Sequence, residues 1–176
     1  MPTEATTQSA TASPGFASGD FRNALGAFAT GVTIVTTRGE EHPYGMTANA
    51  FSSVSLDPPL VLVCVKSFSE GADLIRENGI FAVNILAAEQ EPLSRYFASK
   101  DRPRGRDAFA DIAHKTAASG SPVLDGSVGY LDCSLHTSHE AGDHVIFIGE
   151  VLALDFDHET APLLFHGGGY RYLKEG

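Results

Sequence analysis

Three histidines and two carboxylates fall within the nine residues 136–144, which read HTSHEAGDH. Imidazoles and carboxylates bind metals and transfer protons, so this segment is the densest source of polar chemistry in the chain. Its histidines are separated by two and then four residues, which matches no standard zinc spacing, and the segment itself contains no cysteine. We therefore interpret 141–143 as the turn of a hairpin with no metal site. His144 then enters the next strand at the rim of the fold, and a metal-dependent hydrolase is the least favoured alternative.

A second group of residues is basic. Local positive charge in an acidic protein predicts an anionic small molecule, such as a phosphate or pyrophosphate. The alternative is a charged loop that binds nothing, since Asp101 and Asp107 dilute the charge. The five cations are Arg95, Lys100, Arg102, Arg104 and Arg106.

Two further stretches predict one binding site. Residues 45–55, GMTANAFSSVS, are unusually small and polar for an extended segment, which indicates the close approach of a backbone or a flat ligand. Residues 66–69, KSFS, combine hydroxyls, a cation and a helix start, which together suit an anion. If each stretch is considered alone, the alternative interpretation is an edge strand for 45–55 and a helix N-cap for 66–69. The buried strand between them favours a shared site.

The elements that must position these residues are mostly strands. We expect a helix capped by Asp20, with an apolar face of Phe21, Leu25 and Phe28, that ends at Thr30-Gly31. Several neighbouring strands are joined by short turns, which favours a mainly β, antiparallel barrel with peripheral helices. Further helices are expected over 69–79, 91–99 and 107–115, a turn over 39–43, and extended segments over 32–37, 44–56, 60–65, 80–86, 128–135, 145–154 and 170–173.

Composition narrows the function classes. The 176 residues include 22 acidic and 12 basic side chains, a net charge of −10 that argues against nucleic-acid or anionic-membrane binding. Residues 1–15 lack large hydrophobes and predict a flexible tail before a single domain over 16–176. Cys64 and Cys133 form no CxxC motif and are interpreted as core residues in strands. With no secretory signal and no apolar run long enough to cross a bilayer, a cytoplasmic protein is expected.

Several common nucleotide-binding and catalytic motifs are missing. The sequence has no Walker A loop, no GxSxG elbow and no GxGxxG after a strand. The triplet Gly167-Gly168-Gly169 lies too near the end to open a Rossmann unit. A nucleotide cofactor must therefore be held in another way.

The segments that are present, taken in their order along the chain, resemble the flavin reductase family, which has the FMN-binding split-barrel fold. The similarity is greatest to the small reductase components of two-component flavin-dependent monooxygenases. Over residues 20–173 the matching segments are FATGVTIVT (28–36), GMTANAFSSVS (45–55), PPLV (58–61), FAVNIL (81–86), GDH (142–144) and PLLF (162–165).

The resemblance implies roles for particular residues. Those matching Met46, Thr47, Ala48 and Asn49, with Ser52 and Ser53, contact the flavin ring and ribityl chain. Those matching Ser67, Phe68 and Ser69 meet the flavin phosphate, and those matching Phe97, Ser99 and Lys100 lie close by. His144 and Tyr170 match groups near the nicotinamide, where we expect His144 to position the ring. Relatives often carry arginines where this chain has Gly167–Gly169, although Arg171 is near.

The implied activity is hydride transfer from NADH, favoured over NADPH, to FAD or FMN by a homodimer that supplies reduced flavin to a partner monooxygenase. The residues leave open FAD against FMN, NADH against NADPH, and whether flavin is a bound cofactor or a released substrate. One alternative is a flavin-binding or electron-carrier protein of the same fold without turnover. Another is a relative acting on a different substrate, as pyridoxamine phosphate oxidases do on a similar barrel.

Overall fold

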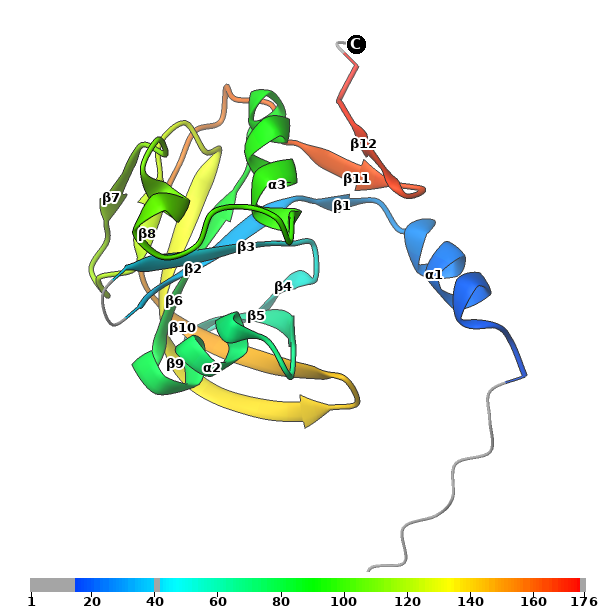
Figure 1. Ribbon diagram of the computed structural model, residues 1–176, viewed down its shortest axis with the longest axis horizontal. Helices are drawn as coiled ribbons and strands as arrows, with labels where there is room; N and C mark the ends of the chain where they lie inside the picture. Colours follow the sequence, from blue (N-terminus) through cyan, green and yellow to red (C-terminus); the bar gives the residue numbers. More distant parts are fainter. Residues whose placement is uncertain (1–14, 40–41, 175–176) are drawn as a thin grey trace, which may run out of the picture.

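A computed structural model describes residues 15–39 and 42–174, and it is built around a seven-stranded antiparallel sheet (Figure 1). Strands β3 and β4 lie at opposite edges of the sheet, which has the order β3-β2-β6-β9-β10-β5-β4, yet only two residues separate them in the chain. The sheet must therefore curl until its edges meet, which makes a barrel with a split between β3 and β4. Its strands are β2 (Thr33–Arg38), β3 (Pro43–Ala48), β4 (Phe51–Leu56), β5 (Pro59–Lys66), β6 (Ile80–Ile85), β9 (Gly129–Ala141) and β10 (His144–Phe156).

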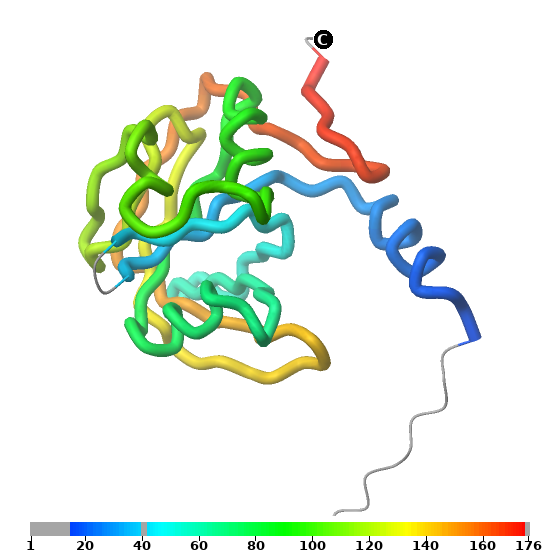
Figure 2. The backbone as a smooth tube through the Cα atoms, viewed as in Figure 1, coloured from blue at the N-terminus to red at the C-terminus, as the bar shows by residue number. Residues whose placement is uncertain are grey.

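The predicted mainly β, antiparallel split barrel is confirmed, and most predicted strands lie within two residues of their expected bounds. One exception is β9, which runs six residues past its predicted end and forms with β10 the long hairpin that is yellow to orange in Figure 2. The other is the extended segment predicted over 44–56, which is divided into β3 and β4 by residues 49–50. Gly142, with φ 66°, makes the hairpin turn between β9 and β10. The HTSHEAGDH segment is therefore the tip of a hairpin, as predicted.

Two small sheets complete the strands. Strands this short show no hydrophobic periodicity, so the sequence predicted only the last of the five strands in these sheets. That strand was predicted to end at residue 173, two residues beyond its observed end. The three-stranded sheet contains β1 (Thr30–Gly31), β11 (Leu164–His166) and β12 (Gly169–Arg171), and the two-stranded sheet contains β7 (His114–Thr116) and β8 (Pro122–Leu124).

Helix α2 forms where the sequence predicts it. The Ser69 hydroxyl accepts a hydrogen bond from the Ala72 backbone N–H at 3.3 Å, which caps the first turn. Gly79 ends the helix with φ 63°, a left-handed conformation that favours glycine. The helices are α1 (Ser18–Gly26), α2 (Glu70–Asn78) and α3 (Glu91–Ala98), with 3₁₀ turns η1 (Ala88–Gln90) and η2 (Gly105–Phe109).

Two helix predictions need correction. Asp20 is not the cap of α1, which begins at Ser18 after the N-cap Ala17 and ends at Gly26, well before Thr30. The helix predicted over 107–115 is also wrong, because η2 ends at Phe109 and residues 114–116 pair with β8 as β7. Burial of Ala108 and Phe109 against α3 mimics a helical pattern, but strand pairing determines the backbone that follows.

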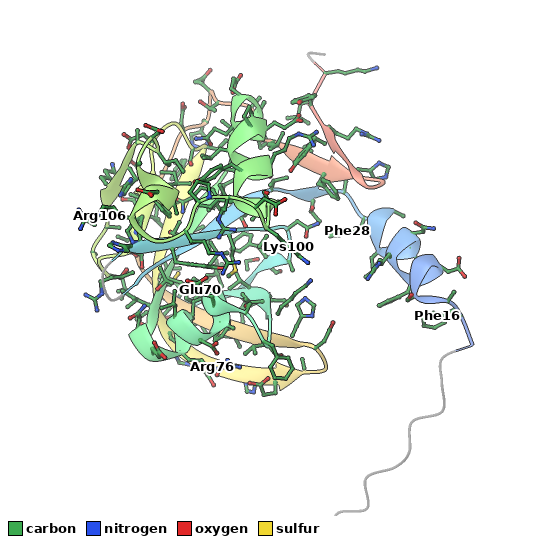
Figure 3. All side chains as sticks on the ribbon, in the orientation of Figure 1. Phe16, Phe28, Glu70, Arg76, Lys100 and Arg106 are labelled. Atoms are coloured by element: carbon green, nitrogen blue, oxygen red, sulfur yellow. The ribbon has the colours of Figure 1, made fainter. Side chains whose placement is uncertain are left out.

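Among the described residues, the apolar face of α1 packs only loosely on its own chain: the Phe16 and Phe21 ring centroids are 5.7 Å apart, and Leu25 and Phe28 border an open cavity with Phe165. None of residues 18–26 is buried, and the helix projects away from the barrel in Figure 1. Phe16 and Phe28 lie near its two ends in Figure 3. The exposed fraction is 51% for Phe21, 59% for Leu25 and 77% for Phe28.

The core has two layers, which explains why β2 is buried on both faces. Val35 points into the barrel with Val63, Phe81 and Phe147. Its neighbour Ile34 points outward into a second cluster beneath α3 and η2. A strand covered on both sides shows no alternation of buried and exposed residues, and the β-branched residues 33–37 are all buried.

The remaining expectations concern turns and termini. The turn predicted over 39–43 is closed by a hydrogen bond from the Gly39 N–H to the His42 carbonyl at 2.9 Å, while residues 40–41 lie outside the described part. The predicted tail, 1–15, lies almost wholly outside it as well, and the domain boundary at 16 stays a prediction. Among the helices of the described residues, none has the length and apolar character needed to cross a bilayer.

Candidate functional site

A groove of about 480 Å³ opens at the split of the barrel, and we call it the rim groove. It lies between the β3–β4 link, the end of β5, the start of α2 and the segment that follows α3. Its volume is in the range of small-molecule sites. The rim groove is lined by Tyr44, Met46, Thr47, Ala48, Asn49, Ala50, Cys64, Val65, Lys66, Ser69, Phe97, Ala98, Ser99, Lys100, Arg102, Arg104 and His144.

The β3 wall is shaped by close packing against α2. A Cβ atom at Gly71 would lie 2.8 Å from Tyr44 Cε1 and 2.9 Å from Met46 Sδ. Only glycine therefore lets the first turn of α2 approach this strand so closely. Thr47 is fixed on the other side, where its hydroxyl donates to the Ser94 carbonyl at 2.7 Å.

Lys66 and His144 face each other at the end of the β5–β10 ladder, where they are paired in register. Ser67 holds this corner by donating its backbone N–H to the Asp143 carbonyl at 3.0 Å. Helix α2 starts directly after, and the first turn of a helix leaves N–H groups without intrahelical partners. A lysine and a helix start thus lie side by side in the rim groove.

The charge of the rim groove differs from that of the protein as a whole. Lys66, Lys100, Arg102 and Arg104 line it, and no Asp or Glu of the described residues does, although the chain carries a net charge of −10. Basic side chains that converge in a concave site concentrate positive potential there. The rim groove therefore favours an anion.

Arg102 is held rigidly within this group. Its guanidinium donates to the Gly45 carbonyl at 2.7 Å and to the Ser99 carbonyl at 3.1 Å. It also lies 5.7 Å from the ring centroids of both Tyr44 and Phe97. The other arginine, Arg104, is 75% exposed and has one distant partner, Glu70 at 3.8 Å.

His144 is oriented by its neighbour. Its Nδ1 lies 2.8 Å from Asp143 Oδ1, and the hydrogen bond and charge of His144 lower the pKa of the Asp143 carboxyl. With Nδ1 engaged, Nε2 is the ring nitrogen left for a ligand in the rim groove. The placement at the barrel rim is as predicted, and the role in nicotinamide binding stays a prediction.

Tyr170 lies in an adjoining cavity of about 270 Å³ rather than in the rim groove itself. Thr47, Ala48 and Asn49 line both, so β3 forms a shared wall. The Tyr170 hydroxyl lies 2.8 Å from Ser94 Oγ, and the Arg95 guanidinium is 4.7 Å from its ring centroid. Arg95 thus lies over the Tyr170 ring and is not part of the basic wall of the rim groove.

Four of the predicted flavin contacts lie outside the rim-groove lining. Ser52 and Ser53 are exposed on β4, which departs along the opposite edge of the split. Ser67 is buried and donates its hydroxyl to Glu140 at 3.4 Å, and Phe68 is 100% exposed. Roles for these four in flavin binding stay predictions. The structure brings together the other residues of the flavin set, which are Met46, Thr47, Ala48, Asn49, Ser69, Phe97, Ser99 and Lys100.

Sequence reasoning overlooked part of the lining. Tyr44 was recoverable from the sequence, because alternate residues of a strand share a face and Met46 is two positions on. Cys64 was interpreted as a core residue, but it is half-exposed in the rim groove, whereas Cys133 is buried. Burial raises the pKa of both thiols. Ala50 lies within the small, polar stretch 45–55 but was not singled out, and Val65 and Ala98 carried no distinguishing signal.

The histidine-rich hairpin does not converge on a metal site in the part of the chain that the structure describes. His136 lies 4.0 Å from Glu150, and His144 pairs with Asp143. Near the C-terminus, Gly167 and Gly168 have positive φ and turn β11 into β12. Arg171 folds back to donate to the Tyr170 carbonyl at 2.8 Å.

Fold and site together define a split-barrel protein with a groove for a small anionic molecule, and comparison with known proteins gives its family. Residues 25–174 match the flavin reductase like domain. The reductase subunit of a flavin-dependent monooxygenase from Rhodococcus jostii is 42% identical over 88% of this chain and 77% of its own length. An NADH-dependent FMN reductase from Agrobacterium fabrum is 43% identical over 85% of this chain and 83% of its own.

The solved structure of an NADH:FAD oxidoreductase from Streptomyces globisporus superposes with a TM-score of 0.86 at 39% identity, over 95% of this chain and 99% of that one. The chain belongs to the flavin reductase like family. The resemblance drawn from its sequence motifs is therefore confirmed.

Proposed function

We propose that this chain is an NADH-dependent flavin reductase that transfers a hydride from NADH to FAD or FMN and supplies reduced flavin to a partner monooxygenase. The observation that carries the proposal is the rim groove, whose small β3 residues and four cations suit a flat, anionic ligand, in a chain of the flavin reductase like family. Bound flavin supplies the hydride-accepting chemistry, while the protein binds and orients both reactants.

Within the rim groove the two ends suit different parts of a flavin. Met46, Thr47, Ala48 and Asn49 present a shallow wall that a planar ring system can approach. Lys66 and Ser69 at the α2 start, with Ser99 and Lys100 directly after α3, offer charge and hydroxyls that suit the flavin phosphate. The relatives cited above support this use, because all three names refer to a flavin and two of them also name NADH.

We assign His144 a positioning role toward the nicotinamide. His144→Ala is expected to raise the KM for NADH about tenfold and to change kcat much less, because the lost contact orients the donor without taking part in hydride transfer. His144→Gln, which places an amide near the Nε2 position, should recover part of the NADH affinity. A large fall in kcat at unchanged KM would contradict the positioning role.

The experiment that tests the reductase is NADH oxidation by the purified protein with FAD, with FMN and without flavin, repeated with NADPH. Turnover that depends on added or bound flavin supports the proposal. The rates also show which flavin and which nicotinamide nucleotide the protein prefers. Good flavin binding without oxidation of either donor would reject the reductase in favour of a flavin carrier.

We further propose that the chain is a homodimer. Besides the α1 face, large apolar side chains are exposed on three other segments, and a second copy of the chain is the occupant that would cover them. These are Val54 and Leu56 of β4 and Leu152, Leu154 and Phe156 of β10, with Tyr172 and Leu173 after β12.

A cytoplasmic location is the last part of the proposal. Both described cysteines are free thiols, which fits a reducing compartment.

A further inference from the structure

A second cavity, of about 460 Å³, adjoins the rim groove on the side away from the Tyr170 cavity. Tyr44, Arg102 and Arg104 line both spaces and so form their common boundary. We call this cavity the outer compartment. Its other lining residues are Gly39, His42, Pro43, Gly45, Glu70, Leu74, Glu77, Pro103, Gly105 and Ala108.

The outer compartment has a different chemistry from the rim groove. It contains two carboxylates, Glu70 and Glu77 of α2, whereas the described lining of the rim groove contains none. A carboxylate accepts hydrogen bonds from hydroxyl and amino groups and repels phosphate. The outer compartment therefore suits a neutral group that is rich in donors, such as a ribose or an amino-substituted base.

Its walls also suit a planar ring. Tyr44 contributes an aromatic side chain, and Leu74 and Pro103 contribute apolar surface. Heteroaromatic bases stack on such walls whatever their hydrogen-bonding pattern.

The boundary between the two spaces is basic. Arg102 is fixed there by the carbonyls of Gly45 and Ser99, and Arg104 extends toward solvent near Glu70. Figure 3 shows Lys100 and Glu70 on elements that lie on two sides of this region. From the rim groove to the outer compartment, the lining therefore changes from the small residues of β3 to the cations of the boundary, and then to the carboxylates and apolar side chains of the outer compartment.

We propose that the outer compartment binds the adenosine half of FAD, with the pyrophosphate crossing the boundary at Arg102 and Arg104, so that this chain prefers FAD to FMN. This proposal rests on the proposed binding of flavin in the rim groove. It adds a second binding space, which FMN does not reach because FMN lacks the adenosine half. NADH also carries an adenosine, and the experiment separates the two sources.

The first test uses the unaltered protein and measures Kd for FAD, FMN and riboflavin, with AMP as a competitor. FAD should bind at least about tenfold more tightly than FMN, because only FAD fills the outer compartment. AMP should compete with FAD and leave riboflavin binding unchanged. Equal affinities for FAD and FMN, or AMP that raises only the KM for NADH, would overturn the proposal.

The second test fills the outer compartment with Leu74→Trp and uses Leu74→Met, which conserves volume, as the matched control. The tryptophan should weaken FAD binding about tenfold and leave FMN binding and FMN-dependent NADH oxidation intact, which also shows that the variant folds. Unchanged FAD affinity would reject the outer compartment and leave the reductase standing. Failure of all three flavins to bind the unaltered protein would reject both.

Discussion

Asn84 shows how a single polar side chain fixes the barrel. It is fully buried, donates to the Ile34 carbonyl at 3.0 Å and accepts the Leu124 backbone N–H at 2.8 Å. These bonds tie the adjoining strands β2 and β6 to β8. An alanine at position 84 removes the acceptor and leaves the N–H of Leu124 buried and unpaired.

Asn84→Ala is therefore expected to lower the free energy of unfolding by about 2 kcal/mol or more, measured by urea denaturation. Flavin affinity at temperatures where the variant is folded should change little, because Asn84 does not line the rim groove. A stability loss below about 0.5 kcal/mol would show that water or a relaxed backbone replaces the amide.

Cys133 gives a prediction on alkaline stability. Burial, with a smaller effect from the charge of Asp132, raises the pKa of its thiol from 9.0 to about 12. The unfolded chain therefore releases this proton above pH 9 while the folded chain keeps it, so the free energy of unfolding falls between pH 9 and 12. Below pH 9 both states hold the proton and the contribution is constant.

Urea denaturation at pH 8, 9 and 10 should show a steeper loss of stability for the unaltered protein than for Cys133→Ala. The variant sets the baseline for the tyrosines and lysines that titrate in the same range. Parallel pH profiles for the two proteins would contradict the assignment.

At the scale of single residues, the sequence predicted well those groups that share one strand or one turn. Met46 to Asn49 and Ser69 line the rim groove together, as the two local patterns predict for one shared site, and their contact with flavin stays a prediction. The family resemblance groups Ser52 and Ser53 with them, and these two lie on β4, at the opposite edge of the sheet from β3 and outside the rim-groove lining. The seam between the two edges is a long-range feature, and spacing along the chain carries no signal for it.

At the scale of elements, α2 is packed so closely on β3 that a single methyl group added to α2 would disturb the strand. Gly71→Ala should weaken flavin binding about tenfold, because overpacking costs about 1–3 kcal/mol and the displaced atoms belong to Tyr44 and Met46 of the rim groove. The measurement is fluorescence titration with FAD and FMN.

Gly19→Ala in α1 is the matched control, since a Cβ there meets nothing within 4 Å. It should leave flavin affinity unchanged and gain the helix stability that alanine gives over glycine, about 0.5–1 kcal/mol. Equal flavin affinity in the two variants would show that Tyr44 and Met46 yield without deforming the groove.

Strands and helices with strong local signals were predictable, and elements fixed by distant partners were not. The β-branched run 32–37 and the Ser69 and Gly79 caps define β2 and α2 by themselves. Residues 107–115 contain helix-forming and apolar residues, but β8 recruits 114–116 as a strand partner. That pairing is a tertiary effect, and it overrides helix propensity.

At the scale of the whole molecule, α1 poses a problem that one chain does not solve. A nine-residue helix has little stability of its own in water, and this one buries none of residues 18–26. Packing of its apolar face against a second copy would supply the missing stabilisation and reduce the exposed apolar surface. The helix should therefore be ordered only in the dimer.

Leu25→Glu tests this. The glutamate should dissociate the dimer, because it places a charge in the apolar contact, and it should cost an isolated chain little, since Leu25 is already 59% exposed. Sedimentation velocity should give twice the chain mass of 18.6 kDa for the unaltered protein and for the control Leu25→Met, and a single chain mass for Leu25→Glu. Circular dichroism should show a matching loss of helix in that variant alone. A dimer that survives the glutamate would assign the contact to the apolar strands β4 and β10 instead, and a monomeric unaltered protein would reject the homodimer.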